Sequence, residues 1–381
     1  MDTNTFNNLI SQTWPDLHAA STLGGGTFGT VYACTKTDAV TGVTQKEAVK
    51  VVRVDFTPED RANAEEEGIP FADYYRAVKE KRLQEIRWMV ALKSPHIVHI
   101  NGYTAIEEPD LSALYILIRM DCLTALDQLR PAHLNDTPEQ AAALAEKVAL
   151  DICDALRVCH QNGVLHRDIK PANILCSDAG DFYLGDFGIS KGTAQQASMT
   201  SSGTLEYAPR EVMTGQYDHR ADLYSLGLVL YALVNHWRGP FLPAYPAPIT
   251  PGDRNQAQYA RMNGTPLPPP DNCPTALWAV IARLCAFKPE ERFDSAEAVL
   301  AALCDPGTPA PAPHRAHPNL PRIRHPRRLA AVVLVFAVAV GVGVGLYRRQ
   351  QMAAPDISLG AGRDSTDTAL AQASDLLQGN E

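Results

Sequence analysis

Hydrophobic and polar positions alternate in two different ways along this chain, and the change of pattern divides it. Up to about residue 120, short apolar runs such as Ala113–Met120 are typical of strands. One stretch with helical spacing, over residues 86–92, interrupts them. Beyond it the helical period dominates, and Glu139–Asn162 predicts one long helix. The pattern therefore predicts a small strand-rich part over residues 16–120 and a mostly helical part over residues 123–304.

The character of the chain changes again after residue 305. Residues 306–328 are rich in proline, with five arginines and no acid, so they cannot bury a core and predict an extended linker. Leu329–Tyr347 then gives 19 residues without a charge, which matches the hydrocarbon thickness of a bilayer. We expect one transmembrane helix there. The tail, 348–381, is too short for a folded sensor domain.

A glycine-rich run opens the strand-rich part. Leu23–Tyr32 reads LGGGTFGTVY, which is G-x-G-x-x-G-x-V with Gly24, Gly26, Gly29 and Val31. Glycines let a backbone close over phosphates and present N–H donors. A dinucleotide-binding turn gives a similar string, but its glycines open a helix. Here β-branched and aromatic residues follow, so the run predicts a loop between two strands.

Two further motifs lie in the helical part. His166–Asn173 reads HRDIKPAN, and DFG follows at Asp186–Gly188. One carboxylate can orient an attacking hydroxyl, and a second carboxylate with an amide oxygen can hold Mg²⁺, which is what phosphoryl transfer from a nucleotide needs. With the glycine loop upstream, the chain resembles the eukaryotic-type protein kinases. The HRD-x-K run resembles their Ser/Thr branch, and the layout with one span resembles bacterial eukaryotic-like kinases.

The resemblance implies an α+β, two-lobed protein kinase fold over residues 16–305, plus one C-terminal transmembrane helix. It implies ATP and Mg²⁺ as cofactors and proteins with Ser or Thr as substrates. The catalytic residues would be Asp168 and Lys170, and the metal ligands Asn173 and Asp186. The nucleotide would be held by Leu23, Gly24, Gly26, Gly29, Val31, Lys50 and Glu85.

Lys50 and Glu85 are expected to act as a pair. Lys50 ends the run EAVK inside an apolar strand pattern and resembles the lysine that holds the α- and β-phosphates. Glu85, counted back from Pro95, falls where the family has the helix carboxylate that braces this lysine. The stretch between them is longer than usual, and residues 59–75 resemble an insertion that could carry regulation or only decorate the surface.

Other positions match supports of the family fold. Glu211 and Arg292 correspond to a buried ion pair, and Asp222 to the aspartate that anchors the HRD backbone. Pro209 and Arg210 stand where the family usually has Ala and Pro, which puts the local loop shape in doubt. Met120 resembles the residue at the back of the adenine pocket, with the hinge at residues 121–124.

Composition restricts the class of protein and of partner. The chain has 381 residues, is 45% hydrophobic and carries a net charge of −9, which argues against nucleic acid as a partner. Its eight cysteines show no metal-binding spacing, so we expect reduced core residues, although a reactive or regulatory thiol stays open. The N-terminus has no signal-peptide pattern.

Charge also predicts orientation. Arginines flank the span on both sides, but more precede it, and a kinase needs ATP, so we expect the kinase domain in the cytoplasm and the tail outside the inner membrane. Gly341 and Gly345 within the span have the spacing that lets two helices approach closely and form a homodimer. The alternative is that glycine is simply common in membrane helices.

Together these features predict a membrane-anchored Ser/Thr kinase. We also expect it to phosphorylate its own activation segment within Ser198–Ser202, where Arg167 could pair with the phosphate. Three alternatives stay open: a pseudokinase acting as a membrane-tethered scaffold, a kinase fold that acts on a small molecule, and a segment that is only a flexible polar loop. Thr204 and Lys170 favour a protein substrate.

Overall fold

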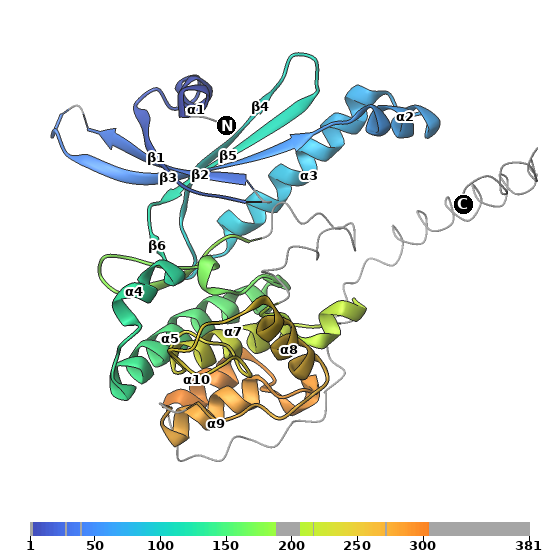
Figure 1. Ribbon diagram of the computed structural model, residues 1–381. Coiled ribbons are helices and arrows are strands. Elements are labelled where there is room, and N and C mark those ends of the chain that lie inside the picture. The colour runs from blue at the N-terminus through green and yellow to red at the C-terminus, as the bar shows by residue number, and fades with distance from the viewer. Residues whose placement is uncertain are drawn as a thin grey trace, which may run out of the picture. The chain divides into compact units, whose positions relative to one another are not determined.

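A five-stranded antiparallel sheet forms the first part of the structure (Figure 1). In this computed structural model the described residues are 3–26, 29–38, 40–187, 206–215, 217–270 and 273–304, all within the unit Met1–His314. The spatial order is β1-β2-β3-β5-β4. The strands are β1 Leu17–Gly26, β2 Gly29–Thr37, β3 Thr44–Asp55, β4 Ile100–Glu107 and β5 Ala113–Asp121.

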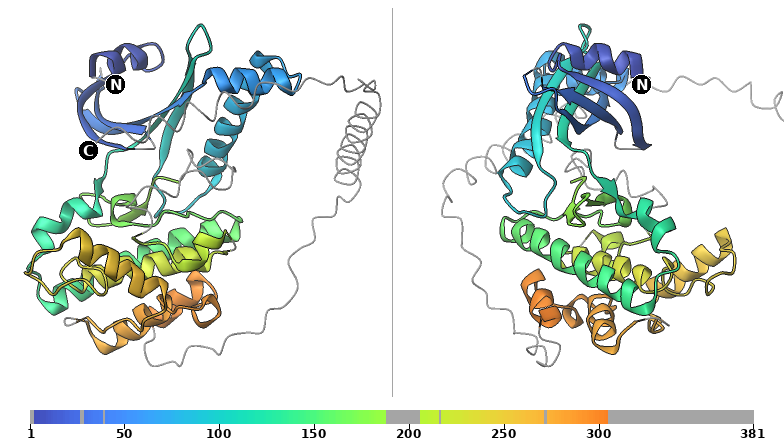
Figure 2. Two further views of the ribbon diagram at one scale, coloured as in Figure 1. Left: turned by 45° about the vertical axis from the view of Figure 1, so that its right-hand side comes forward. Right: turned by 90° about the vertical axis from the view of Figure 1, so that its left-hand side faces the viewer.

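Side chains of β3 and β5 are buried on both faces of this sheet. On one face Ile116 and Val52 pack against α3, Phe71–Ala91, while on the other Val49 packs under α1, Thr3–Ser11. Figure 2 shows the two helices on different sides of the sheet. Helix α1 was not predicted. The sequence feature that could have predicted it is the unbroken apolar character of β3 and β5. Strands buried on both faces lose the usual alternation, so a second element must cover the other face of the sheet.

Helix α1 is held by aromatic stacking. The rings of Phe6 and Tyr32 lie 3.9 Å apart and nearly parallel, and Ile10 is also fully buried. The Asn7 side chain accepts a hydrogen bond of 2.9 Å from the backbone N–H of Ala19, at the start of β1. The segment before residue 16 is therefore part of the sheet-bearing half.

The second part is helical and built around α7, Arg220–Leu233 (Figure 1). Every residue of α7 after Arg220 is buried, which explains why it is apolar on all sides. Gly227 allows α9, Thr275–Leu284, to approach, because a Cβ there would lie 2.7 Å from Cys285 Sγ. The other helices are α4 Arg130–His133, α5 Pro138–Gln161, α8 Pro251–Met262 and α10 Ala296–Cys304, and a small sheet contains β6 Thr124–Ala125, β7 Ile174–Cys176 and β8 Phe182–Leu184.

The predicted elements agree with the structure in type and place. The strand expected at Ala113–Met120 is β5, and the long helix expected at Glu139–Asn162 is α5. The expected insertion, residues 59–75, forms most of α2, Pro58–Glu66, and the start of α3. Thr57 begins α2 with a capping box.

All eight cysteines lie in the described residues, and none forms a disulfide. Burial raises the pKa of Cys34, Cys159 and Cys285 to about 12, so these thiols stay protonated at neutral pH. This agrees with the expected role as small core residues.

The linker, the predicted span Leu329–Tyr347 and the tail lie outside the described residues. Among the residues that are described, no helix is both long and apolar enough to cross a membrane.

Candidate active site

A cavity of about 520 Å³ brings most of the predicted nucleotide-site residues together. Its lining comes from the β1–β2 hairpin, from β3 and β5, and from the loop before β7. Glu85 and Asp168 are not among the lining residues, and Gly26 ends β1, where it pairs with Gly29. The predicted residues that line the cavity are Leu23, Gly24, Gly29, Val31, Lys50, Lys170, Asn173 and Asp186.

The glycines of the hairpin form one wall of the cavity. Gly29 has φ +124°, and a Cβ there would lie 2.2 Å from the Val51 carbonyl oxygen, so only glycine fits. A Cβ on Gly24 would meet no atom within 4 Å, so the space beside this residue is open to a ligand. Gly25, which the motif did not single out, also lines the cavity. A bare backbone beside a lysine suits the phosphates of a nucleotide.

The register of β3 and β5 decides which residue of β5 lies opposite Lys50. Lys50 pairs with Ile118, and Ala48 pairs with Met120, one step nearer the hinge. Ile118 is 1% exposed, whereas Met120 is only partly buried. Both residues line the cavity, and the structure places Ile118, not Met120, opposite the lysine. The two share a strand face, so the sequence pattern alone could not separate them.

Lys50 does not contact the carboxylate that was expected to brace it. Its Nζ forms an ion pair with Asp186, and Glu85 instead accepts a hydrogen bond of 3.2 Å from Arg82. Arg82 lies one turn before Glu85 on α3, the spacing at which side chains of a helix meet. Burial raises the pKa of Glu85, although Arg82 acts against this. The pairing of Lys50 with Glu85 would require a different arrangement of α3.

Hydrogen bonds join the predicted polar residues of the catalytic loop. Lys170 Nζ lies 3.1 Å from Asp168 Oδ2, and Asn173 Nδ2 donates to the Asp168 carbonyl at 2.7 Å and to its carboxylate at 3.1 Å. Asp168 is 6% exposed. Carboxylate, ammonium and amide therefore meet at the edge of the cavity.

The catalytic loop is anchored to α7 by Asp222. Its carboxylate accepts hydrogen bonds from the backbone N–H groups of His166 and Arg167, at 2.9 and 2.8 Å, and lies 3.0 Å from His160 Nε2. Burial alone would raise the pKa of Asp222, but the His160 contact and these donors hold it below its usual range. Arg167 has φ +65°, a strained value that needs such support. The expected anchoring role of Asp222 is confirmed.

His166 connects the catalytic loop to the segment that carries Asp186. Its Nε2 lies 2.8 Å from the Gly185 carbonyl oxygen, and its Nδ1 lies 3.3 Å from the Asp168 backbone nitrogen, which donates. Burial lowers the pKa of His166. The ring therefore stays neutral, with Nε2–H as the donor.

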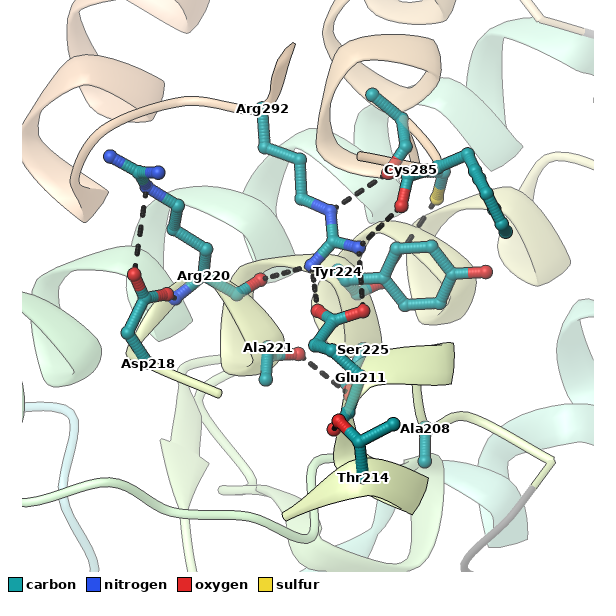
Figure 3. Close-up of polar contacts among 12 residues, drawn as sticks. Ala208, Glu211, Thr214, Asp218, Arg220, Ala221, Tyr224, Ser225, Cys285 and Arg292 are labelled. Atoms are coloured by element: carbon teal, nitrogen blue, oxygen red, sulfur yellow. Dashed lines mark hydrogen bonds and ion pairs between the residues drawn. The ribbon is translucent and has the colours of Figure 1, made fainter. Parts of the chain in front are cut away.

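The expected pair of Glu211 and Arg292 is present, with the guanidinium fully buried and the carboxylate partly buried (Figure 3). The two guanidinium–carboxylate distances are 2.5 and 3.2 Å, and the same guanidinium donates to the Ala286, Phe287 and Arg220 carbonyls. The loop shape that Pro209 and Arg210 put in doubt is a short 3₁₀ turn, which Pro209 caps and Arg210 begins. Glu211 lies within that turn.

The residues present fit a magnesium nucleotide. Mg²⁺ is typically bound through one or two carboxylates together with phosphates and water. Within the described ranges no group of three or more His, Cys, Asp or Glu side chains could hold a metal by itself. Asp186 and Asn173 both line the cavity and would supply one carboxylate and one amide oxygen, which leaves further ligand positions to the nucleotide.

The activation segment lies mostly outside the described residues. Gly188 and residues 189–205, with Ser198–Ser202 and Thr204, are among those not described. The Arg167 guanidinium, expected to meet a phosphate there, lies 5.7 Å from the centre of the Tyr217 ring.

Comparison with known proteins agrees with this geometry. Residues 17–302 match the protein kinase domain family. The chain is 33% identical over 333 residues to the serine/threonine-protein kinase PknJ of Mycobacterium tuberculosis, covering 80% of this chain and 50% of that protein. It is 29% identical over 301 residues to PknH of Mycobacterium bovis, covering 76% and 44%. The chain thus spans half or less of the length of these relatives.

Removal of the buried guanidinium should destabilise the protein strongly. We expect Arg292→Met to lower the free energy of unfolding by about 3–5 kcal/mol, because Glu211 keeps a charge without its partner. The exposed pair of Arg254 and Glu206, 3.4 Å apart, offers a matched control. Arg254→Met should cost less than about 1 kcal/mol. Urea unfolding followed by circular dichroism measures both, and equal losses would contradict the assigned role of Arg292.

Proposed function

The chain belongs to the protein kinase family, and from this we propose that it is a membrane-anchored Ser/Thr protein kinase that transfers the γ-phosphate of ATP to protein hydroxyls. The observation that carries the proposal is the meeting of Lys50, Asp186 and Asn173 in one cavity, with Asp168 at its edge. Its relatives PknJ and PknH are named serine/threonine-protein kinases.

Each residue of the site has a role that follows from its chemistry. Asp168 accepts the hydrogen bond of the substrate hydroxyl and orients it, while Lys170 offsets charge on the transferred group. Lys50 holds the α- and β-phosphates once it leaves Asp186. Asn173 and Asp186 would hold Mg²⁺, which neutralises phosphate charge when bound. Most of the rate enhancement then comes from positioning and charge stabilisation.

We further propose a cytoplasmic kinase domain and one span. The support is the uncharged run Leu329–Tyr347, bracketed by Arg327–Arg328 and Arg348–Arg349. The tail would lie outside the inner membrane. Two copies could associate through Gly341 and Gly345.

A pseudokinase scaffold is the second candidate. It is favoured by the ion pairs of the site, in which Lys50 contacts Asp186 and Glu85 contacts Arg82. If the protein is a scaffold, these two ion pairs would be permanent and Mg·ATP would not be turned over.

Asp168→Asn should abolish phosphoryl transfer while nucleotide binding is largely kept, since Asp168 meets the hydroxyl rather than the nucleotide. We expect a loss of at least about two orders of magnitude in rate. Turnover of Mg·ATP with a Ser/Thr peptide and binding of a fluorescent nucleotide measure the two properties. Asp178→Asn, an exposed aspartate near the same loop, is the control. Absence of turnover in the unaltered protein would favour the scaffold instead.

The intact chain should sediment with membranes, and the truncated chain 1–305 should be soluble and active. The reason is that the span supplies only anchoring, while every predicted catalytic and nucleotide-binding residue lies before residue 212. Fractionation by ultracentrifugation and a kinase assay on both forms test this. A soluble intact chain would refute the anchor, and a folded but inert 1–305 would show that later residues are needed for activity.

The purified protein should phosphorylate itself within Ser198–Ser202, at Thr200 or Ser201 first. A phosphate adds about −1.5 to −2 charges, which could pair with Arg167 in place of its contact with Tyr217. Mass spectrometry after Mg·ATP locates the site, and a variant with Ser198, Thr200, Ser201 and Ser202 changed to Ala tests its importance. An unmodified segment, or a variant as active as wild type, would contradict the proposal.

A further inference from the structure

The loop between α3 and β4 is attached to the helical part of the domain at several points. The Val98 N–H donates to the Leu184 carbonyl at 3.1 Å, and the Leu184 N–H donates to the His96 carbonyl at 2.8 Å. The Ser94 hydroxyl donates to the Asp154 carboxylate at 3.1 Å. Since this loop follows α3 directly, these contacts restrain the C-terminal end of the helix that carries Glu85.

The imidazole of His96 makes one hydrogen bond of normal length and one longer approach to a carboxylate. Its Nδ1 lies 3.0 Å from the Phe182 carbonyl oxygen. A carbonyl oxygen can only accept, so Nδ1 carries the hydrogen, and in the neutral ring Nε2 carries a lone pair. That Nε2 lies 3.7 Å from the Asp151 carboxylate. A lone pair and a carboxylate do not attract, whereas a protonated ring would form an ion pair with Asp151.

The Asp151 carboxylate is fixed in place independently of His96. Its side chain is 7% exposed, against 20% for His96. It lies 2.8 Å from Lys147 Nζ and accepts a 2.9 Å hydrogen bond from the Phe182 N–H. The carboxylate therefore stays in place whether or not His96 is charged.

Acidic groups outnumber basic groups around His96. The pKa of Asp154 is lowered, because hydrogen bonds from Arg157 and Ser94 and the charge of Arg157 outweigh its burial, and a hydrogen bond from Lys147 lowers the pKa of Asp181. Both remain carboxylates at mildly acidic pH. Tyr183 adds only a ring, 6.2 Å away. The charged groups facing His96 are Lys147, Asp151, Asp154 and Arg157 of α5 and Asp181 before β8, three acids against two bases.

We propose that His96 is a positioning residue for α3, which ties the helix to α5 more strongly when its imidazole is protonated than when it is neutral. Protonation adds an ion pair with Asp151 at the base of α3. Its effect on catalysis rests on the proposed kinase function. Mild acid then holds α3 in the arrangement observed, with Glu85 on Arg82 and Lys50 on Asp186, and slows turnover.

Hydrogen exchange on the full chain tests the attachment itself. Amide protection at Val98 and Leu184, corrected for the intrinsic exchange rate, should rise about threefold between pH 7.5 and 5.5, as a partly exposed ion pair permits. His96→Gln, which cannot become charged, should abolish the rise. Asp151→Asn should abolish it too, while it keeps an acceptor for the Phe182 N–H. His99→Gln, an exposed histidine of the same loop, should behave as wild type. A rise that persists in His96→Gln would overturn the proposal.

The pH profile of kinase activity tests the consequence. Between pH 7.5 and 6, kcat of wild type and His99→Gln should fall about threefold more than kcat of His96→Gln. Equal profiles would remove His96 from any role in positioning α3. A wild-type protein without turnover at any pH would refute the kinase function, and the exchange measurement would then decide by itself whether the attachment depends on protonation.

Discussion

The buried carboxylate of Asp222 is the interaction on which the candidate active site depends. It lies on α7, whose residues after Arg220 are all buried, and Asp222 itself is only 2% exposed. Two consecutive backbone N–H groups, of His166 and Arg167, converge on it. They hold Arg167 at a positive φ that an isolated loop would avoid. Asp168 follows directly, so its position is set by the packing of α7 and not by the loop alone.

Two carboxylates, those of Asp186 and Glu85, compete for the Lys50 ammonium. A lysine at the back of a cavity forms an ion pair with whichever carboxylate the surrounding elements place within reach. The structure brings Asp186 to it and leaves Glu85 with Arg82. Exchange of these partners requires movement of α3, which is attached through the loop with His96 to α5. The choice of ion-pair partner for Lys50 therefore depends on how firmly α3 is attached to α5.

The supports of the fold are distributed over both halves of the domain. In the helical half, the buried guanidinium of Arg292 holds the turn with Glu211 through a bidentate pair. In the other half, α1 covers the outer face of the sheet by stacking Phe6 on Tyr32. Neither pair lines the cavity. Both keep the elements that carry the reactive side chains in register, which is the usual division between supporting and reacting residues.

The sequence by itself determined the chemistry of the loop with Asp168, Lys170 and Asn173, because these side chains lie within a few residues of one another and their spacing alone brings them together. It also predicted the long helix and the strands around the glycine run, at Lys50 and at Ala113–Met120. Tertiary structure alone decided three points: that Ile118 rather than Met120 lies beside Lys50, that Asp186 rather than Glu85 is its partner, and that α1 covers the sheet. Each depends on the register or packing of segments distant in the chain, and a linear pattern carries no information about which of two chemically suitable partners the fold brings closer.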